Sequence, residues 1–214
     1  MTPSRRSARA RRPYHHGNLR RALLDEAVAT IRTDGVAALT LREIGARVGV
    51  SRTALYRHFA DKDALLAAVA TEGFHSLRER LVEAWETGGR TPDAFRAMGA
   101  AYIAFALDNP PHYRVMFGGF LRGEAHDPEL AAEGAGAFQA LVDALAALQR
   151  DGFVRDDDTV LMARFVWAMV HGLAMFAIDA QVQEPGAIEE LTAYAFERMR
   201  VGLSAAPGAA GRER

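Results

Sequence analysis

The sequence predicts an all-α protein in which three short helices precede a larger helical body. Apolar residues recur at helical spacing from Asn18 onward, and no stretch shows the strict alternation of a half-buried strand. Capping residues and glycines divide residues 18 to 60 into separate helices. The 214 residues, half of them hydrophobic, can bury the core of one large domain or of a small and a larger one.

The first predicted helix follows a basic N-terminal segment. Residues 1 to 13 are expected to form a flexible basic arm, because arginine, serine, alanine and proline offer little surface to bury. From Asn18, Leu19, Leu23 and Ile31 share one helical face, and Gly35 offers a left-handed stop.

Two start signals define the second helix. Thr40 and Glu43 have the spacing of a capping box, and Leu39 and Ile44 that of a hydrophobic staple. Gly49 tolerates the positive φ of a helix C-terminus, so this helix can last only about two turns.

The third helix, of about nine residues, begins at Ser51, a natural N-cap. A helical wheel places one set of side chains inward: Ala54, Leu55, His58 and Phe59. The other set faces outward: Arg52, Thr53, Tyr56 and Arg57. Arginine can bind guanine in a bidentate contact and tyrosine can reach a phosphate, so this pattern favours a helix-turn-helix over an ordinary amphipathic hairpin.

Charge is distributed unevenly along the chain. Residues 1 to 60 hold 12 Arg against 4 acids, a balance of +8, and residues 61 to 214 hold 14 basic against 23 acidic residues, a balance of −9. A basic head on an acidic body indicates a polyanion partner for the head, although a charged tail with solvated helix faces would give the same counts.

The remainder of the chain is predicted to be helical throughout. A helix from about Asp61 is broken by GGRTP at 88 to 92, and the next, Phe95 to Leu107, by NPP at 109 to 111. Further helices are expected over 128–150, 159–181 and 186–203, with a flexible tail at 206–214. Two stretches are rich in aromatic residues and methionine, AYIAFALDNPPHYRVMFGGF at 101–120 and FVWAMVHGLAMFA at 165–177.

Several chemistries find no support in the sequence. Cysteine is absent, the histidines lack metal-ligand spacing, and no nucleophile elbow or phosphate-binding glycine pattern occurs. The acids at 156 to 158 suit a helix N-terminus. We therefore expect no enzyme, cofactor or metal. With no signal sequence and no long uninterrupted apolar run, we expect a cytoplasmic protein without a membrane partner.

The run LTLREIGARVGVSRTALYRHFADKDALL, residues 39–66, resembles the DNA-binding domain of the TetR family of bacterial regulators, as does YHHGNLR at 14–20. The resemblance implies a helix-turn-helix domain over 14–60 and a helical domain for ligand binding and dimerisation over 61–205. It implies that Thr40, Tyr56 and Lys62 hold phosphates. The base readers implied are Arg42, Arg52, Thr53 and Ala54, with Arg57 and His58 at the edge and Ser51 in the same contact set. Gly45 departs from the usual alanine and leaves room for close helix packing.

The C-terminal half resembles the WHG-type ligand-binding domain of some of these regulators, through Trp167, His171 and Gly172. The resemblance implies a homodimer built on the last two helices and a pocket enclosed by helices four to eight. The candidate pocket residues are Tyr102, Phe105, Met116, Phe117, Phe120, Trp167, His171, Met175 and Phe176. Each could instead be core or dimer interface, and His171 in particular could be a satisfied buried histidine.

Together these patterns predict a ligand-responsive repressor that a small apolar or aromatic effector releases from a palindromic operator in double-stranded DNA. Two alternatives stay open. One is a DNA-binding regulator without a diffusible ligand, and the other is a small-molecule binding module with a vestigial DNA-binding head.

Overall fold

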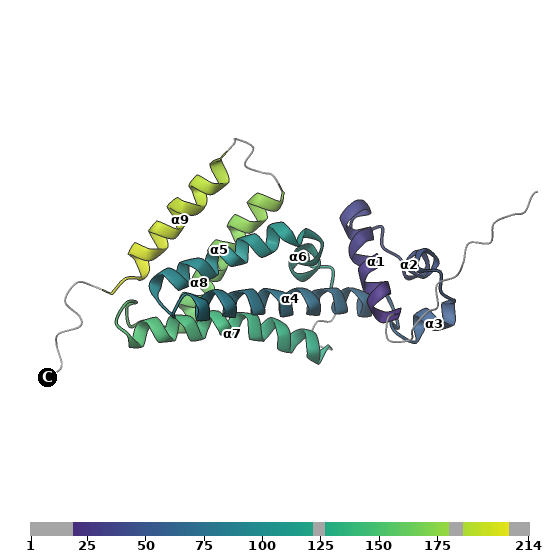
Figure 1. Cartoon of the computed structure of the whole chain (residues 1–214), viewed down its shortest axis with the longest axis horizontal. Helices are drawn as coiled ribbons and strands as arrows, with labels where there is room; N and C mark the ends of the chain where they lie inside the picture. The colour runs from purple at the N-terminus through teal and green to yellow at the C-terminus, as the bar shows by residue number, and fades with distance from the viewer. Residues whose placement is uncertain (1–18, 122–126, 180–185, 206–214) are drawn as a thin grey trace, which may run out of the picture.

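The computed structural model describes residues 19–121, 127–179 and 186–205, and these form nine α-helices (Figure 1). The prediction of an all-α protein is confirmed. The expected basic arm at 1–13, the YHHGN segment at 14–18 and the tail at 206–214 lie outside the described residues.

The first three helices form a compact unit, which we call the head. They are α1 (Leu19–Asp34), α2 (Leu41–Val48) and α3 (Arg52–Tyr56). Leu23, Ile31 and Ile44 are almost completely buried between them. Gly35 ends α1 with a φ of 81°, as the sequence predicted.

The turn between α2 and α3 follows from Gly49. This glycine has a φ of 79°, and the next N–H, of Val50, donates to the carbonyl of Gly45 at 2.9 Å. The close helix packing predicted at Gly45 is confirmed, because a Cβ there would lie 3.1 Å from Leu55 Cδ2. A tight left-handed turn therefore brings α2 and α3 into direct contact.

Two details of the head differ from the prediction. The prediction of a nine-residue third helix was wrong, because α3 spans five residues. The N–H groups of His58 and Phe59 both donate to the Leu55 carbonyl, which closes the helix and turns Phe59 into the core. The capping box is half formed: Thr40 Oγ1 accepts from the Glu43 N–H, but Thr40 Oγ1 also donates to the Glu43 carboxylate.

The remaining helices form the body, with α4 along its axis (Figure 1). They are α4 (Lys62–Thr87), α5 (Pro92–Asp108), α6 (Pro110–Phe117), α7 (Pro128–Arg150), α8 (Thr159–Ile178) and α9 (Ala187–Leu203). α4 packs against α5, α6 and α7, and its N-terminal part also packs against α1 of the head. Asp61 caps α4, and Asp158 caps α8, which confirms that the acids at 156 to 158 suit a helix N-terminus.

α6 was not predicted from the sequence. The NPP segment at 109–111 was predicted to be a break, whereas Pro110 and Pro111 occupy the first turn of a new helix, where a backbone N–H is not needed. α6 packs closely on α4, because a Cβ on Gly73 would lie 2.5 Å from Met116 Sδ.

α8 and α9 leave much apolar surface uncovered. Within the described part of the chain, α8 is long and apolar enough to cross a membrane, yet core helices of soluble proteins meet the same criterion. Only 33% of its most apolar window is buried in the single chain. α9 packs on α8 and diverges from α5 (Figure 1). Much of the apolar surface of α8 is therefore left exposed in the single chain.

Candidate nucleic-acid interface and cavity

The outward face of α3 lies as the wheel predicted. Arg52, Thr53 and Arg57 are exposed, and the Tyr56 side chain is 44% exposed. Leu55 and Phe59 are buried, whereas Ala54 and His58 are half-buried at the edge of the face. The Arg52 guanidinium lies 5.5 Å from the centre of the Tyr56 ring, so these two side chains form one cationic and aromatic surface.

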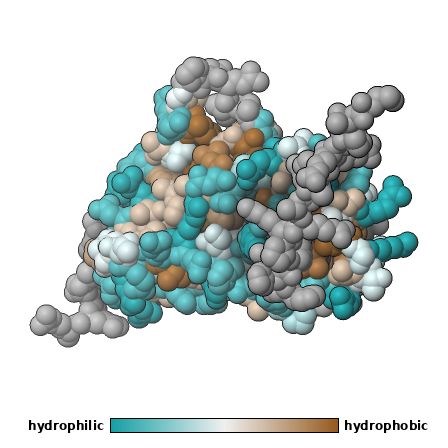
Figure 2. Space-filling model, turned by 45° about the vertical axis from the view of Figure 1, so that its right-hand side comes forward, coloured by the Kyte–Doolittle hydropathy of each residue, from teal (hydrophilic) through white to brown (hydrophobic). Residues whose placement is uncertain are grey.

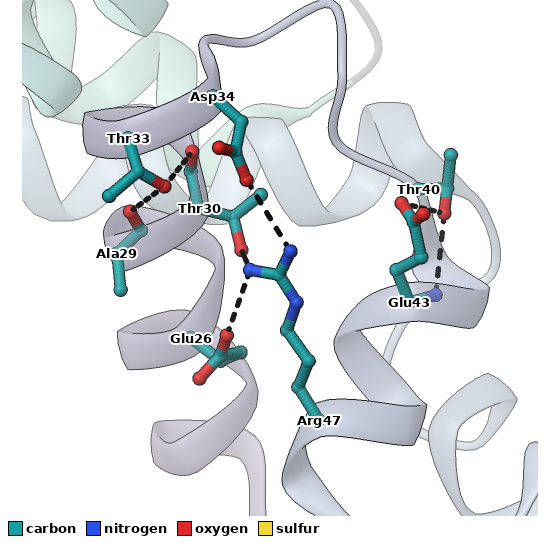
Figure 3. Close-up of polar contacts among 8 residues, drawn as sticks. All are labelled: Glu26, Ala29, Thr30, Thr33, Asp34, Thr40, Glu43 and Arg47. Atoms are coloured by element: carbon teal, nitrogen blue, oxygen red, sulfur yellow. Dashed lines mark hydrogen bonds and ion pairs between the residues drawn. The ribbon is translucent and has the colours of Figure 1, made fainter.

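Arg47 joins α2 to α1 and does not belong to this surface (Figure 3). Its guanidinium donates to Thr30 Oγ1 at 3.0 Å and also contacts the carboxylates of Glu26 and Asp34. The hydrogen bonds that Arg47 donates to Asp34 and, to a smaller extent, to Glu26 raise the pKa of its guanidinium. Thr30 is the buried polar side chain of the described core, so Arg47 also satisfies its hydroxyl.

The arginines of the head therefore fall into two groups. Arg21 pairs with Asp25 and with Glu72 of α4, and Arg47 pairs with Glu26 and Asp34. In contrast, five exposed arginines have no acidic partner within ion-pair distance, as far as the structure describes the chain: Arg20 and Arg32 of α1, Arg42 of α2, and Arg52 and Arg57 at α3. The intramolecular pairs thus leave uncompensated positive charge beside α3.

Two of the expected phosphate contacts already have partners within the protein. Lys62 is half-buried, and its ammonium donates to the carbonyl of Val36 at 2.9 Å. Thr40 is exposed, with its hydroxyl in the cap of α2. Ser51 likewise accepts from the Ala54 N–H at 3.2 Å. The ammonium of Lys62 keeps further donor capacity, so its contact with phosphate stays a prediction.

A cavity of about 530 Å³ lies in the body between α5 and α9. α4, α7 and α8 supply the rest of its wall together with the segment after α7, whereas α6 supplies none. Its apolar lining residues are Leu81, Pro92, Phe95, Met98, Gly99, Leu141, Leu148, Phe153, Val154, Val166, Val170, Ala193, Phe196, Met199 and Leu203. Its volume lies within the range of small-molecule sites.

Two of the candidate pocket residues, Tyr102 and Trp167, line this cavity. Phe105, Met116 and Phe117 pack into the core around α4 and α6 instead. Met175 is also packed against the core, whereas Phe120 and Phe176 are exposed, at 41% and 42%. The predicted pocket differs from the observed cavity because the aromatic side chains of α6 pack toward α5 and α8, while α9 forms one side of the cavity.

His171 belongs to a polar cluster within this aromatic core. Its Nδ1 lies 2.7 Å from Tyr113 Oη, which lies 3.1 Å from Tyr102 Oη. Burial lowers the pKa of His171 and raises the pKa values of Tyr102 and Tyr113, so all three side chains are favoured in their neutral forms. Because the Tyr113 hydroxyl donates to Tyr102, a neutral His171 can donate its Nδ1–H to the Tyr113 oxygen. The cluster therefore ties α5, α6 and α8 together.

The cavity residues on α9 were not predicted from the sequence. One usable signal was Gly99 in the interior of α5, because an isolated helical glycine often marks a close approach. A Cβ there would lie 2.9 Å from Phe196 Cζ on α9. Across the described ranges, no three histidine or acidic side chains gather as a metal site would require.

An exposed, uncompensated arginine face on the second helix of a helix-turn-helix is typical of DNA-binding proteins. Comparison with known families supports this class. Residues 23–69 match the family described as bacterial regulatory proteins, tetR family, and residues 95–199 match the Tetracyclin repressor-like C-terminal domain. The two matches cover more than half of the chain, which therefore belongs to the TetR family of DNA-binding transcriptional regulators.

Solved structures agree with the fold. A protein with unknown function from Rhodococcus sp. RHA1 is 31% identical, with a TM-score of 0.80 over 91% of this chain and 100% of that one. A tetR-family regulatory protein from Rhodococcus RHA1 is 20% identical, with a TM-score of 0.69 over 87% and 97% of the two chains. The TetR family regulator PfmR from Thermus thermophilus is 23% identical, with a TM-score of 0.65 over 90% and 99%. The latter two share the fold.

Proposed function

We propose that this regulator is a homodimeric repressor that a small apolar or aromatic molecule releases from a palindromic operator. The observation that carries the proposal is the cavity of about 530 Å³ in the body, at the far end of a helix that reaches the head. Its wall is mostly apolar and includes two aromatic candidates from the sequence, Tyr102 and Trp167.

α4 offers a mechanical link between the cavity and the head. This single helix of 26 residues, about 39 Å long at about 1.5 Å per residue, packs against α1 near its start. Leu81, near its other end, lines the cavity. A ligand that displaces the C-terminal part of α4 would therefore move the head.

Dimerisation is supported by an apolar stripe on α8 and α9, which we call the outer stripe. On α8, Leu161 and Phe165 are 61% and 49% exposed, and Ala168 and Gly172 continue the same face. Tyr194 and Val201 of α9 are 63% and 52% exposed. The space-filling view shows hydrophobic side chains at the surface in the upper part of the body (Figure 2). A second copy would cover this stripe and provide the second recognition helix that a palindromic operator requires.

The proposed release is a population shift. The ligand binds better to a body shape that holds the two α3 helices at the wrong separation for successive major grooves. A coupling free energy of about 1 to 3 kcal/mol would weaken operator binding roughly 5- to 150-fold.

Footprinting tests the proposal directly. The purified full chain is footprinted on DNA upstream of its own gene and of neighbouring genes, with and without apolar and aromatic compounds. We expect a two-fold symmetric footprint that an effective compound removes. The cavity-filling variant Ala193→Trp should keep the footprint and lose the response, because Ala193 is an exposed part of the cavity wall.

The matched control is Ala97→Trp, which adds the same ring at an exposed position of α5 outside the cavity. It should keep both the footprint and the response. A response that survives in Ala193→Trp would place the ligand elsewhere, and an asymmetric footprint would contradict the dimer.

A further inference from the structure

We infer that the ligand of the cavity is a carboxylic acid with an apolar body, and that its carboxylate binds Arg96 at the edge of the cavity. This inference rests on the proposed function and adds the chemical class of the effector. The cavity joins an apolar interior to a cluster of charged side chains, which is the pattern that an amphiphilic molecule fits.

The charged residues of the cavity wall lie on the two helices that face each other across it. Asp93 and Arg96 belong to α5, and Glu197 and Arg200 belong to α9. The side chains contributed by α4, α7 and α8 are apolar or aromatic. An entering ligand would therefore place its apolar part against those three helices and a polar group between α5 and α9.

Three of these four charges are already compensated within the chain. Arg200 holds Glu197 through two hydrogen bonds, of 2.8 Å from Nε and 2.7 Å from Nη2. These bonds lower the pKa of Glu197, so its carboxylate neutralises Arg200. Asp93 lies in the first turn of α5, where the free N–H groups and the helix dipole favour a negative charge.

Arg96 is the fourth charge, and it has no such compensation. It is exposed, and within the described ranges no carboxylate lies within ion-pair distance of its guanidinium and no hydrogen bond engages it. A guanidinium offers a planar pair of donors that matches a carboxylate. It can therefore bind an anionic head group without first breaking an internal ion pair.

The charge balance favours a monoanion over a phosphate ester. A phosphate monoester carries about −1.5 to −2 charges at neutral pH, more than one guanidinium balances. The excess would lie near Asp93 and Glu197, which line the same cavity. A carboxylate brings one negative charge, which Arg96 alone neutralises.

Isothermal titration of the full-length protein with matched acids and alcohols tests the inference. The probes are decanoate against 1-decanol and 4-butylbenzoate against 4-butylbenzyl alcohol, so that chain and ring shapes are both covered. We expect at least one acid to bind about tenfold more tightly than its alcohol, which is the size of one partly exposed charge-assisted hydrogen bond. In Arg96→Gln this preference should fall to within about twofold, with the affinity for the alcohol unchanged.

Arg150→Gln is the control, because it removes the same charge from an exposed position of α7 outside the cavity. It should keep the preference for the acid. Equal affinity for acid and alcohol, or a preference that Arg96→Gln retains, would overturn the head-group assignment and leave the proposed function standing. If neither member of either pair binds, both the inference and the proposed ligand response fail.

Discussion

At the scale of single residues, the head separates structural arginines from exposed ones. Arg21 and Arg47 are held by acids, and Arg42, Arg52 and Arg57 project from α2 and α3 without an acidic partner in the described chain. An arginine without an internal partner does not have to break an ion pair before it binds DNA. Base reading is therefore expected from the second group.

Arg52→Ala should cost about 1 to 3 kcal/mol of binding free energy on the operator and relax the choice of base. On random DNA the loss of binding free energy should be smaller, because the substitution removes only an electrostatic attraction to the phosphates there. Titrations of both DNAs at one salt concentration measure the difference. Arg32→Ala, which removes an exposed charge from α1, should leave the ratio of the two affinities unchanged. Equal losses on both DNAs for Arg52→Ala would reject its role as a base reader.

His171 should make the stability of the body depend on pH. Burial lowers its pKa below the ordinary value of 6.5, so between the two values the unfolded chain binds a proton that the folded chain does not. The free energy of unfolding should therefore fall as the pH drops below about 6.5, and become level below the folded pKa.

Urea unfolding at pH 7.5 and 5.5 measures this loss in the native chain and in His171→Gln. Gln has no titrating group, so the variant should lose less stability between the two pH values. Burial also lowers the pKa of His112, and its contribution is common to both proteins and cancels in the comparison. An identical loss in the variant would show that His171 does not titrate differently on folding.

At the scale of helices, Arg47 is expected to stabilise the head by joining α2 to α1. Arg47→Ala should lower the melting temperature, because it leaves the buried Thr30 hydroxyl and two carboxylates without their partner. Arg42→Ala removes the same charge from the same helix, where no internal partner is within reach in the described chain. It should leave the melting temperature unchanged. Thermal unfolding followed by circular dichroism compares the two, and equal effects would mean that the contacts of Arg47 contribute nothing.

Local signals explain which elements could be predicted from the sequence. Thr40, Ser51 and Asp158 each accept a hydrogen bond from an N–H three residues later, and Gly49 ends α2 through its own positive φ. Such features depend on neighbouring residues and were predicted correctly. α6 was missed because a proline pair is compatible with both a break and a helix start.

The cavity could not be predicted in the same way, because it depends on the approach of α9 to α5 across nearly 100 residues of chain. Phe196 contacts Gly99 there, and nothing in the sequence around either residue indicates this contact. Aromatic content was a poor guide, because Phe105 and Tyr113 are among the most buried residues of the core. Arg96 and Arg200 had no distinguishing pattern in the sequence, because they line one cavity only in the folded chain.

At the scale of the whole molecule, the outer stripe should hold two copies together. Its centre on α8 combines large side chains, such as Phe165, with small residues that allow helices to approach closely. A Cβ added to Gly172 would meet no atom of the chain within 4 Å, so this position faces open space that a partner helix could occupy. The three residues of the WHG motif thus lie on different faces of α8. Trp167 lines the cavity, His171 belongs to the polar cluster, and Gly172 lies on the outer stripe.

Phe165→Glu should convert the protein to a folded monomer, because it places a charge within an apolar interface that a partner would otherwise desolvate. The single chain should tolerate the change, since Phe165 is 49% exposed. Size-exclusion chromatography with light scattering gives the mass, and circular dichroism gives the fold. Val82→Glu, at a 42% exposed apolar position on α4 away from the stripe, should remain dimeric.

The monomer should still bind random DNA through its head and lose most of its preference for the operator, because one recognition helix reads only one half-site. A dimeric Phe165→Glu protein would exclude the outer stripe as the interface, and a monomer with undiminished operator preference would exclude a palindromic operator.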